Sequence, residues 1–245
     1  MSKSGIRRRY EAFQERISEA CERTGRSTDS VRLMAVSKQQ PDAKITEALD
    51  AGIRCFGENR VQELVRRWPA TLDADGDCLD SGVRRKDVHV SLIGHLQRNK
   101  AAQVSGFVDS IESIDNPRTV DALVSRLSTQ APMDVLVQIN TSGEKSKFGL
   151  AEDEKEIFEL VDLLCSVDAL RPRGVMTVAP FVDDERAIRG CFQSLRAWYE
   201  KIGREYTIDL WDTISMGMSG DFEIAVEEGS TEVRIGTGIF GERTP

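Results

Sequence analysis

Near its end the chain reads Asp209-Leu210-Trp211-Asp212-Thr213-Ile214-Ser215-Met216-Gly217-Met218-Ser219-Gly220 and then Gly229-Ser230-Thr231-Glu232-Val233-Arg234-Ile235-Gly236-Thr237-Gly238. Both stretches begin as a short apolar strand and run into small residues, which let the main chain approach an anion closely. A helix that begins near Ser219 would direct its partial positive end to the same place. The pattern predicts a phosphate site at the ends of two neighbouring strands.

Similar strand-like runs, rich in Val, Ile and Leu, recur along the chain and alternate with helical patterns. We predict eight strands, at Arg32–Ser37, Arg54–Phe56, Val88–Ile93, Phe107–Ile111, Asp134–Ile139, Leu170–Val175, Leu210–Ser215 and Glu232–Ile235. The helices expected between them include Asp42–Ala51, Arg60–Trp68, Pro117–Ser128, Asp153–Ser166 and Asp184–Ile202. This alternation predicts an α/β fold, a single-domain (β/α)8 TIM barrel over residues 1–245 with an extra N-terminal helix. An open doubly wound sheet is the alternative.

The composition is that of an ordinary globular domain, with 245 residues, 40% hydrophobic and 30% charged. A net charge of −8 disfavours nucleic acid as a partner, since phosphate backbones are bound by clustered Lys and Arg. The dense basic run Arg7-Arg8-Arg9 lies on the predicted N-terminal helix, so a solvated helix face is favoured over a patch for an anionic partner.

Neither a membrane nor an oxidising compartment is indicated. The N-terminus has no apolar leader and no stretch of eighteen apolar residues occurs, so we expect no membrane association and a cytoplasmic location. The five cysteines predict neither a disulfide framework nor a metal site, because their spacings are scattered: Cys21, Cys55, Cys78, Cys165 and Cys191.

Residues 73–87 interrupt the strand and helix pattern. The segment is polar, contains Gly and has almost no apolar periodicity, so we interpret it as a surface loop insertion. Its aspartates do not follow the ligand order of a calcium loop.

Polar residues follow the predicted strands, at the end where the functional groups of such barrels lie. They are Lys38, Gly57–Asn59, Gly94–Gln97, Glu112–Ser113, Asn140–Thr141, Met176–Thr177, Ser215–Ser219 and Gly236–Thr237. Loops are polar in general, and this alone accounts for Ser113 and Asn140. Together, however, the positions predict one functional face.

Lys38 ends a strand that is apolar at nearly every residue, and such a strand belongs in the interior. Partial desolvation at the mouth of a buried strand would favour a neutral, nucleophilic amine able to form a Schiff base. The alternative is an ordinary surface lysine. An amine beside a phosphate site is what pyridoxal phosphate requires.

Arg234 precedes Gly236 by two residues, so both project to the same face of a strand. An arginine keeps its proton, so a pyridine nitrogen facing it must accept a hydrogen bond and stay unprotonated. Such a ring is a weak electron sink, which restrains carbanion chemistry. The alternative for Arg234 is an interior ion pair with Glu232 or Glu58. An acid/base role for His95 is the weaker interpretation of that residue.

The chain resembles the pyridoxal phosphate homeostasis proteins, whose barrel is similar to the N-terminal domain of alanine racemase. The matching stretches are Ala35–Lys38, Phe56–Glu63, Ile93–Lys100, Gly174–Thr177, Ser215–Asp221 and Gly229–Thr237. The departures are Gln39-Gln40, Arg60 and the insertion at 73–87.

The resemblance implies a fold-type III barrel that holds pyridoxal 5'-phosphate as a Schiff base on Lys38. It implies that Ser219, Gly236 and Thr237, with Met218 in the same motif, bind the phosphate. It also implies that Arg234 meets the pyridine nitrogen and that Asn59 lies near the ring.

We therefore expect a carrier and regulator of this cofactor, with other B6 vitamers as further candidate ligands and with no catalytic residue and no metal assigned. Racemases on this barrel use a tyrosine from an added domain, whereas Tyr10, Tyr199 and Tyr206 all lie in helical segments here. The alternative is a low-turnover fold-type III enzyme, an amino-acid racemase or decarboxylase. A more distant one is a Schiff-base aldolase that acts on a phosphorylated sugar without a cofactor.

Overall fold

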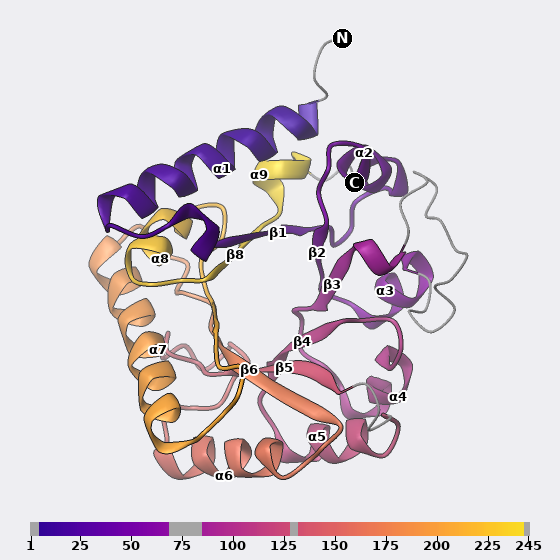
Figure 1. The fold of residues 1–245 in the computed structure, drawn as a ribbon, viewed down its shortest axis with the longest axis vertical. Helices are drawn as coiled ribbons and strands as arrows, with labels where there is room; N and C mark the ends of the chain where they lie inside the picture. Colours follow the sequence, from indigo (N-terminus) through magenta and orange to yellow (C-terminus); the bar gives the residue numbers. More distant parts are fainter. Residues whose placement is uncertain (1–4, 69–84, 128–131, 243–245) are drawn as a thin grey trace.

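The computed structural model describes residues 5–68, 85–127 and 132–242, within which eight parallel strands close into a barrel (Figure 1). The strands are β1 (Arg32–Val36), β2 (Cys55–Glu58), β3 (His89–Leu92), β4 (Ser110–Ile114), β5 (Met133–Gln138), β6 (Leu170–Met176), β7 (Thr213–Ser215) and β8 (Glu232–Ile235). The barrel closes where β1 pairs with β8, in a register that sets Arg32 beside Glu232 and Met34 beside Arg234. The predicted barrel is confirmed, and the open doubly wound sheet is excluded.

Helices surround the barrel (Figure 1). The α-helices of the described residues are α1 (Gly5–Arg23), α2 (Asp42–Asp50), α3 (Val61–Arg67), α4 (Ala101–Val104), α5 (Pro117–Val124), α6 (Glu154–Cys165), α7 (Glu185–Glu205), α8 (Phe222–Glu227) and α9 (Thr237–Phe240). Short 3-10 helices in the described ranges join them: η1 (Thr28–Ser30), η3 (Arg85–Asp87) and η4 (Arg98–Lys100). Several helices start where the sequence places a cap, since Asn116, Asp153 and Asp184 each accept a first-turn N–H.

The leading helix α1 packs against α8 and α9, outside β1 and β8 (Figure 1). Phe13 of α1 meets Phe222 edge to face, with ring centroids 5.1 Å apart. A Cβ on Gly238 would lie 2.3 Å from the Phe13 ring, so only glycine permits this approach of α9. The basic run of α1 also bonds within the molecule, because Arg7 and Arg9 donate to the carbonyls of Asp50 and Ile239.

Strand β4 starts three residues later than predicted. The carboxylate of Asp109 accepts from the Val90 N–H at 2.7 Å and from Arg85 at 3.0 Å, so the chain joins the barrel only after this residue. Glu112 and Ser113 therefore lie within β4, not beyond its end as expected, and both are buried.

Strand β7 is also shorter than predicted, because Leu210–Asp212 leave the sheet. Trp211 stacks on Tyr199 of α7 with ring centroids 5.4 Å apart. Each of these residues also bonds to the other's carbonyl, through the indole N–H and the phenol hydroxyl. Leu210 is exposed.

Most of the predicted insertion at 73–87 lies outside the described residues. Its last part forms η3, where Arg85 is fully buried and donates to the Val88 carbonyl at 2.6 Å and to Asp109. Arg85 alone departs from the expectation of a surface loop, because its guanidinium supports the start of β3, whereas Lys86 and Asp87 are exposed.

Candidate functional site

A cavity of about 540 Å³ opens at the C-terminal ends of the strands. Its lining includes all seven residues that the sequence singled out: Lys38, Asn59, Met218, Ser219, Arg234, Gly236 and Thr237. They come from the loops after β1, β2 and β7 and from β8 with its following loop. The amine at the end of the first strand and the small residues after the last two thus share one cavity, as the parallel barrel requires.

Lys38 is half-buried and lies in a short loop clamped by α3. Arg67 of α3 donates to the carbonyl of Ser37 at 3.1 Å and to that of Gln40 at 2.7 Å, on either side of the lysine. Gln39 has a φ of 58°, and its N–H donates to Glu63 of α3 at 2.8 Å. The loop that carries the amine is therefore fixed by the adjacent helix.

The clamp is completed by Glu58, a fully buried carboxylate at the end of β2. Its Oε1 accepts from the Ser37 hydroxyl at 2.7 Å, from the Trp68 indole at 3.3 Å and from the guanidinium of Arg67. Burial raises the pKa of Glu58, while the charge of Arg67 and the hydrogen bonds oppose the rise. The Glu58–Arg67 pair therefore supports the Lys38 loop from outside the barrel.

Arg234 enters the cavity from β8 and is 4% exposed. Its guanidinium donates to the Ser215 hydroxyl at 2.5 Å and to the Thr177 carbonyl at 2.6 Å. The ion pair considered as an alternative is wrong for both candidate partners, because Glu232 pairs with Arg32 at 2.6 Å and Glu58 pairs with Arg67. The Arg234 guanidinium can therefore direct its charge into the cavity.

Hydroxyl groups and small residues also line the cavity. Ser219 follows β7, while Gly236 and Thr237 lead from β8 into the short helix α9, whose first N–H groups have no acceptor within the helix. The helix expected near Ser219 begins later, at Phe222, because the Asp221 carboxylate accepts from the Met218 N–H at 2.5 Å and shapes the loop. A phosphate site after strands seven and eight, beside a short extra helix, is common in such barrels.

Sequence reasoning missed the apolar wall of the cavity, formed by the loop after β6. Pro180, Phe181 and Val182 line the cavity together with Ile188 of α7, and the carboxylate of Asp183 lines it as well. Phe181 is 99% exposed. The signal that the sequence offered for this loop was an aromatic residue, Phe181, a few positions after the end of a strand.

His95 does not line this cavity. It lies in a neighbouring one of about 600 Å³ that shares only Asn59 with it. The ring of His95 stacks on Phe148 at 4.1 Å, and its Nδ1 is 3.5 Å from Asp115. Another cavity, about 700 Å³, opens at the N-terminal ends of the strands, away from the face where barrels of this type carry their chemistry.

Disulfide, metal and membrane-spanning features are absent from the part of the chain that the structure describes. Four cysteines are free thiols, namely Cys21, Cys55, Cys165 and Cys191, whereas Cys78 lies outside these residues. No group of three or more His, Cys, Asp or Glu side chains in the described ranges could hold a metal ion. None of the helices in those ranges is both long and apolar enough to cross a bilayer.

The fold and the cavity define a (β/α)8 barrel that combines an amine with an anion-binding wall. Residues 9–244 match the alanine racemase N-terminal domain family. The pyridoxal phosphate homeostasis proteins of Aquifex aeolicus and Escherichia coli are each 38% identical to the chain, with 94% of the chain matched in both cases and 94% and 93% of those proteins covered. The chain belongs to this family of pyridoxal phosphate homeostasis proteins, within the alanine racemase N-terminal domain family.

Solved structures agree with this placement. The chain is similar to PipY of Synechococcus elongatus with PLP bound, with a TM-score of 0.73 and 29% identity over 92% of this chain and 100% of that one. Alanine racemase from E. faecalis shares the fold, with a TM-score of 0.64 at 14% identity, and the match covers 94% of this chain and 58% of the racemase.

Proposed function

We propose that the chain binds pyridoxal 5'-phosphate in the 540 Å³ cavity and acts as an intracellular carrier of this cofactor. Lys38 would hold the aldehyde as a Schiff base, while Ser219, Gly236 and Thr237, flanked by Met218, would bind the phosphate. Asn59 would lie beside the ring. One observation carries the proposal: the amine and the anion-binding loops line a single cavity.

The described residues fit the cofactor chemically. Its phosphate would meet hydroxyls and main-chain N–H groups, and its ring would meet the apolar side chains of the loop after β6. Arg234 faces the cavity while it donates to Ser215 and to the Thr177 carbonyl, so its guanidinium is held in place before a ligand arrives. Because an arginine can only donate, a pyridine nitrogen beside it stays unprotonated.

A carrier is favoured over a racemase because the described lining of the cavity offers no tyrosine as a second acid or base, while its carboxylates are those of Asp183 and Asp221. Among the described residues that line it there is no Tyr, His or Cys. Outside the barrel, the Tyr199 hydroxyl donates to the Trp211 carbonyl and the Tyr206 hydroxyl donates to Asp162 of α6. Tyr10 lines the cavity at the N-terminal ends of the strands. The relatives named pyridoxal phosphate homeostasis proteins support the same role, as does PipY with PLP bound. A cytoplasmic location and binding of other B6 vitamers belong to this proposal.

Visible absorbance tests the proposal. The purified protein should absorb as a Schiff base, and Lys38→Ala should abolish that absorbance. Lys44→Ala is the matched control, because Lys44 bonds to Gln40 and to the Phe240 carbonyl nearby without lining the cavity. Borohydride reduction followed by mass spectrometry should place the modification on Lys38. A colourless wild type, or a coloured Lys38→Ala protein, would refute the proposal.

A racemase or decarboxylase of low turnover is separated from a carrier by isotope exchange at Cα. Across a panel of amino acids, a carrier should exchange this proton slowly or not at all. Rapid exchange would favour the enzyme.

A further inference from the structure

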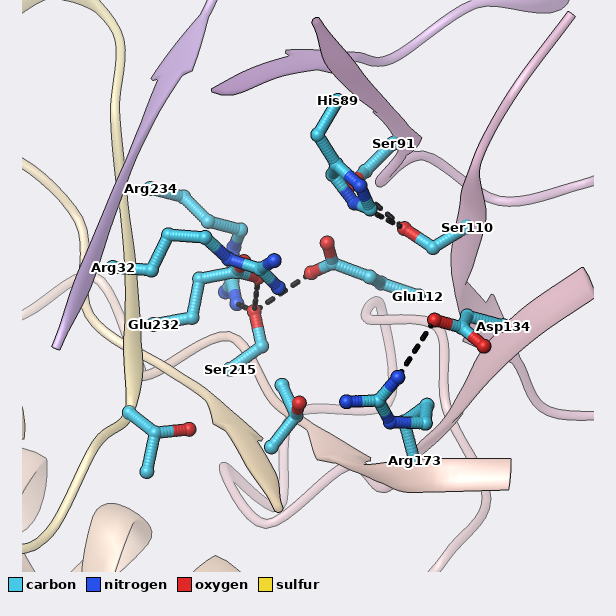
Figure 2. A network of polar contacts seen from close by, with 12 residues as sticks. Arg32, His89, Ser91, Ser110, Glu112, Asp134, Arg173, Ser215, Glu232 and Arg234 are labelled. Atoms are coloured by element: carbon cyan, nitrogen blue, oxygen red, sulfur yellow. Dashed lines mark hydrogen bonds and ion pairs between the residues drawn. The ribbon is translucent and has the colours of Figure 1, made fainter. Parts of the chain in front are cut away.

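The interior of this barrel is polar, whereas such interiors are usually filled by branched aliphatic side chains. Figure 2 shows the polar side chains pointing inward from the strands toward one another. They are Arg32, His89, Ser91, Ser110, Glu112, Asp134, Arg173, Ser215, Glu232 and Arg234. Arg234 belongs both to this network and to the cavity at the C-terminal ends of the strands.

Ser215 is the junction of the network. Its Oγ lies 2.5 Å from Nη1 of Arg234, 2.7 Å from Oε2 of Glu112 and 3.0 Å from Oε1 of Glu232 (Figure 2). Ser215 and Glu232 are fully buried, and Glu112 is 1% exposed. The two carboxyl groups thus share the Ser215 hydroxyl as a common partner.

Counting protons at this junction shows that one is needed on a carboxyl group. A guanidinium only donates, so the Ser215 oxygen accepts from Arg234, and its single proton can serve one carboxyl oxygen. The second carboxyl oxygen must then donate to Ser215 or to the other carboxyl group. Two ionised carboxylates would instead face each other in the buried interior of the barrel, at a high electrostatic cost.

The surroundings assign that proton to Glu112. Oε2 of Glu232 accepts from Nε of Arg32 at 2.6 Å, so Glu232 already has a cationic partner in direct contact. Glu112 has no such direct partner among the described residues, because Asp134 pairs with Arg173 at 3.0 Å and Arg234 reaches only Ser215 and the Thr177 carbonyl. Burial, followed by the charge of Glu232, raises the pKa of Glu112 to about 8.

We infer that Glu112 is a neutral carboxylic acid that positions Arg234, by orienting the Ser215 hydroxyl to receive the guanidinium while leaving its charge to the cavity. If Glu112 were ionised, it would compete for that charge and draw the guanidinium into the barrel. Glu112 is therefore a positioning residue, and its link to the cofactor rests on the proposed function. The ionisable groups around it are Arg32 on β1, Cys55 on β2, His89 on β3, Asp134 on β5, Arg173 on β6, and Glu232 and Arg234 on β8.

Infrared spectroscopy of the full chain at pH 7 tests the protonation directly. In heavy water, the wild type should show a protonated-carboxyl stretch that Glu112→Gln lacks. Other buried acids cancel in the difference between the two spectra. Absence of the band from the wild type, or its persistence in Glu112→Gln, would overturn the inference.

Equilibrium unfolding provides a second readout. A glutamine reproduces both the donor and the acceptor of a neutral acid, so Glu112→Gln should keep the wild-type fold, and near pH 7 it should have the higher folding constant because the unfolded wild type is ionised there. Between pH 5 and 7.5 the folding constant of the wild type, divided by that of Glu112→Gln, should fall about tenfold per pH unit, because folding then takes up one proton at Glu112. A ratio independent of pH would contradict the inference. Glu232→Gln is the contrasting variant: it removes the charge that Arg32 needs and should lower the folding constant at every pH in this range.

Cofactor binding separates this inference from the proposed function. Above pH 8 the affinity for pyridoxal phosphate should weaken more in the wild type than in Glu112→Gln, and the comparison cancels the titration of the Lys38 amine. Equal weakening in both proteins would refute the positioning role. A colourless wild type that still shows the infrared band would refute the proposed function and support the neutral state of Glu112.

Discussion

Replacing Arg67 with Met should destabilise the protein and loosen the loop that carries Lys38. The Arg67 side chain is 5% exposed, and its guanidinium donates to the Ser37 and Gln40 carbonyls and to Glu58. Methionine fills similar space but donates none of these hydrogen bonds. The Glu58 carboxylate, fully buried, would then lose its charge partner.

The expected cost is about 3–5 kcal/mol of unfolding free energy, the usual effect of removing one partner from a buried ion pair. The neighbouring Arg66 provides the control. It pairs with Asp42 at 2.8 Å on the surface, where both side chains are more than half exposed, so Arg66→Met should cost about 0–1 kcal/mol. Adding Glu58→Gln to Arg67→Met should recover part of the loss, with a coupling of about 0.5–3 kcal/mol.

The loss should also depend on pH in a defined direction. The pKa of Glu58 is raised in the folded protein by burial and held back by Arg67, so Arg67→Met should raise it further. A raised carboxyl pKa means that folding binds a proton, and the resulting stability declines as pH rises from the unfolded value through the folded one. Arg67→Met should therefore be closer to wild type at pH 5 than at pH 8.

Urea unfolding of the wild type, both single variants and the double variant at these two pH values measures all of these effects. The rate at which visible absorbance develops on adding pyridoxal phosphate should also differ between wild type and Arg67→Met, because the loop around Lys38 would be less ordered in the variant. If Arg67→Met lowered the free energy of unfolding as little as Arg66→Met does, or if its effect did not change with pH, the role of Arg67 in holding the Lys38 loop would be refuted.

Three further predictions use other features of the barrel. Gly174→Ala should lower the free energy of unfolding by at least about 4 kcal/mol, since its φ is 155° and a Cβ would lie 1.7 Å from the Thr213 carbonyl oxygen. Gly190 lies in open space on α7, so Gly190→Ala should instead stabilise the protein by about 0.5–1 kcal/mol. Thermal unfolding compares the two variants. Pyridoxal phosphate at about 100 times its Kd should add about 2.7 kcal/mol to wild-type stability in urea and less to Lys38→Ala. Arg234→Glu should protonate the cofactor ring and increase half-transamination, measured from the absorbance of the bound cofactor, whereas Arg234→Gln should not; equal values would contradict the proposed environment of the ring nitrogen.

The strand and helix pattern was predictable because each unit carries its own local signal. Val and Ile runs marked the strands, and Asp153 and Asp184 marked helix starts. The predicted start of β4 was wrong because the observed start depends on the contact of Asp109 with Val90, nineteen residues away. This pairing has no local signature. The prediction that Trp211 lies in a strand was wrong because this apolar side chain packs on Tyr199 of α7 instead of within the sheet. This contact has no local signature either.

The location of the seven residues singled out from the sequence in one cavity was also predictable, because parallel strands bring all their C-terminal ends to one face. The polar groups behind that face were not. Glu232 and Arg32 are 200 residues apart, and they become partners only when β8 closes the barrel against β1. The clamp of Arg67 on the Lys38 loop likewise depends on the orientation of α3, which the sequence does not specify.

Lys38 and Arg234 are supported by separate polar clusters. Ser37, Glu58 and Arg67 hold the amine loop from the outer side of the sheet, while Ser215 joins Arg234 to Glu112 inside the barrel. No hydrogen bond described in either cluster joins it to the other, so Arg67→Met and a Glu112 variant should have additive effects on unfolding free energy. Their effects on cofactor affinity should not add, because a single ligand would have to engage both the amine and the guanidinium. Additive stability combined with coupled affinity is therefore the signature expected of two independent supports that meet only at the ligand.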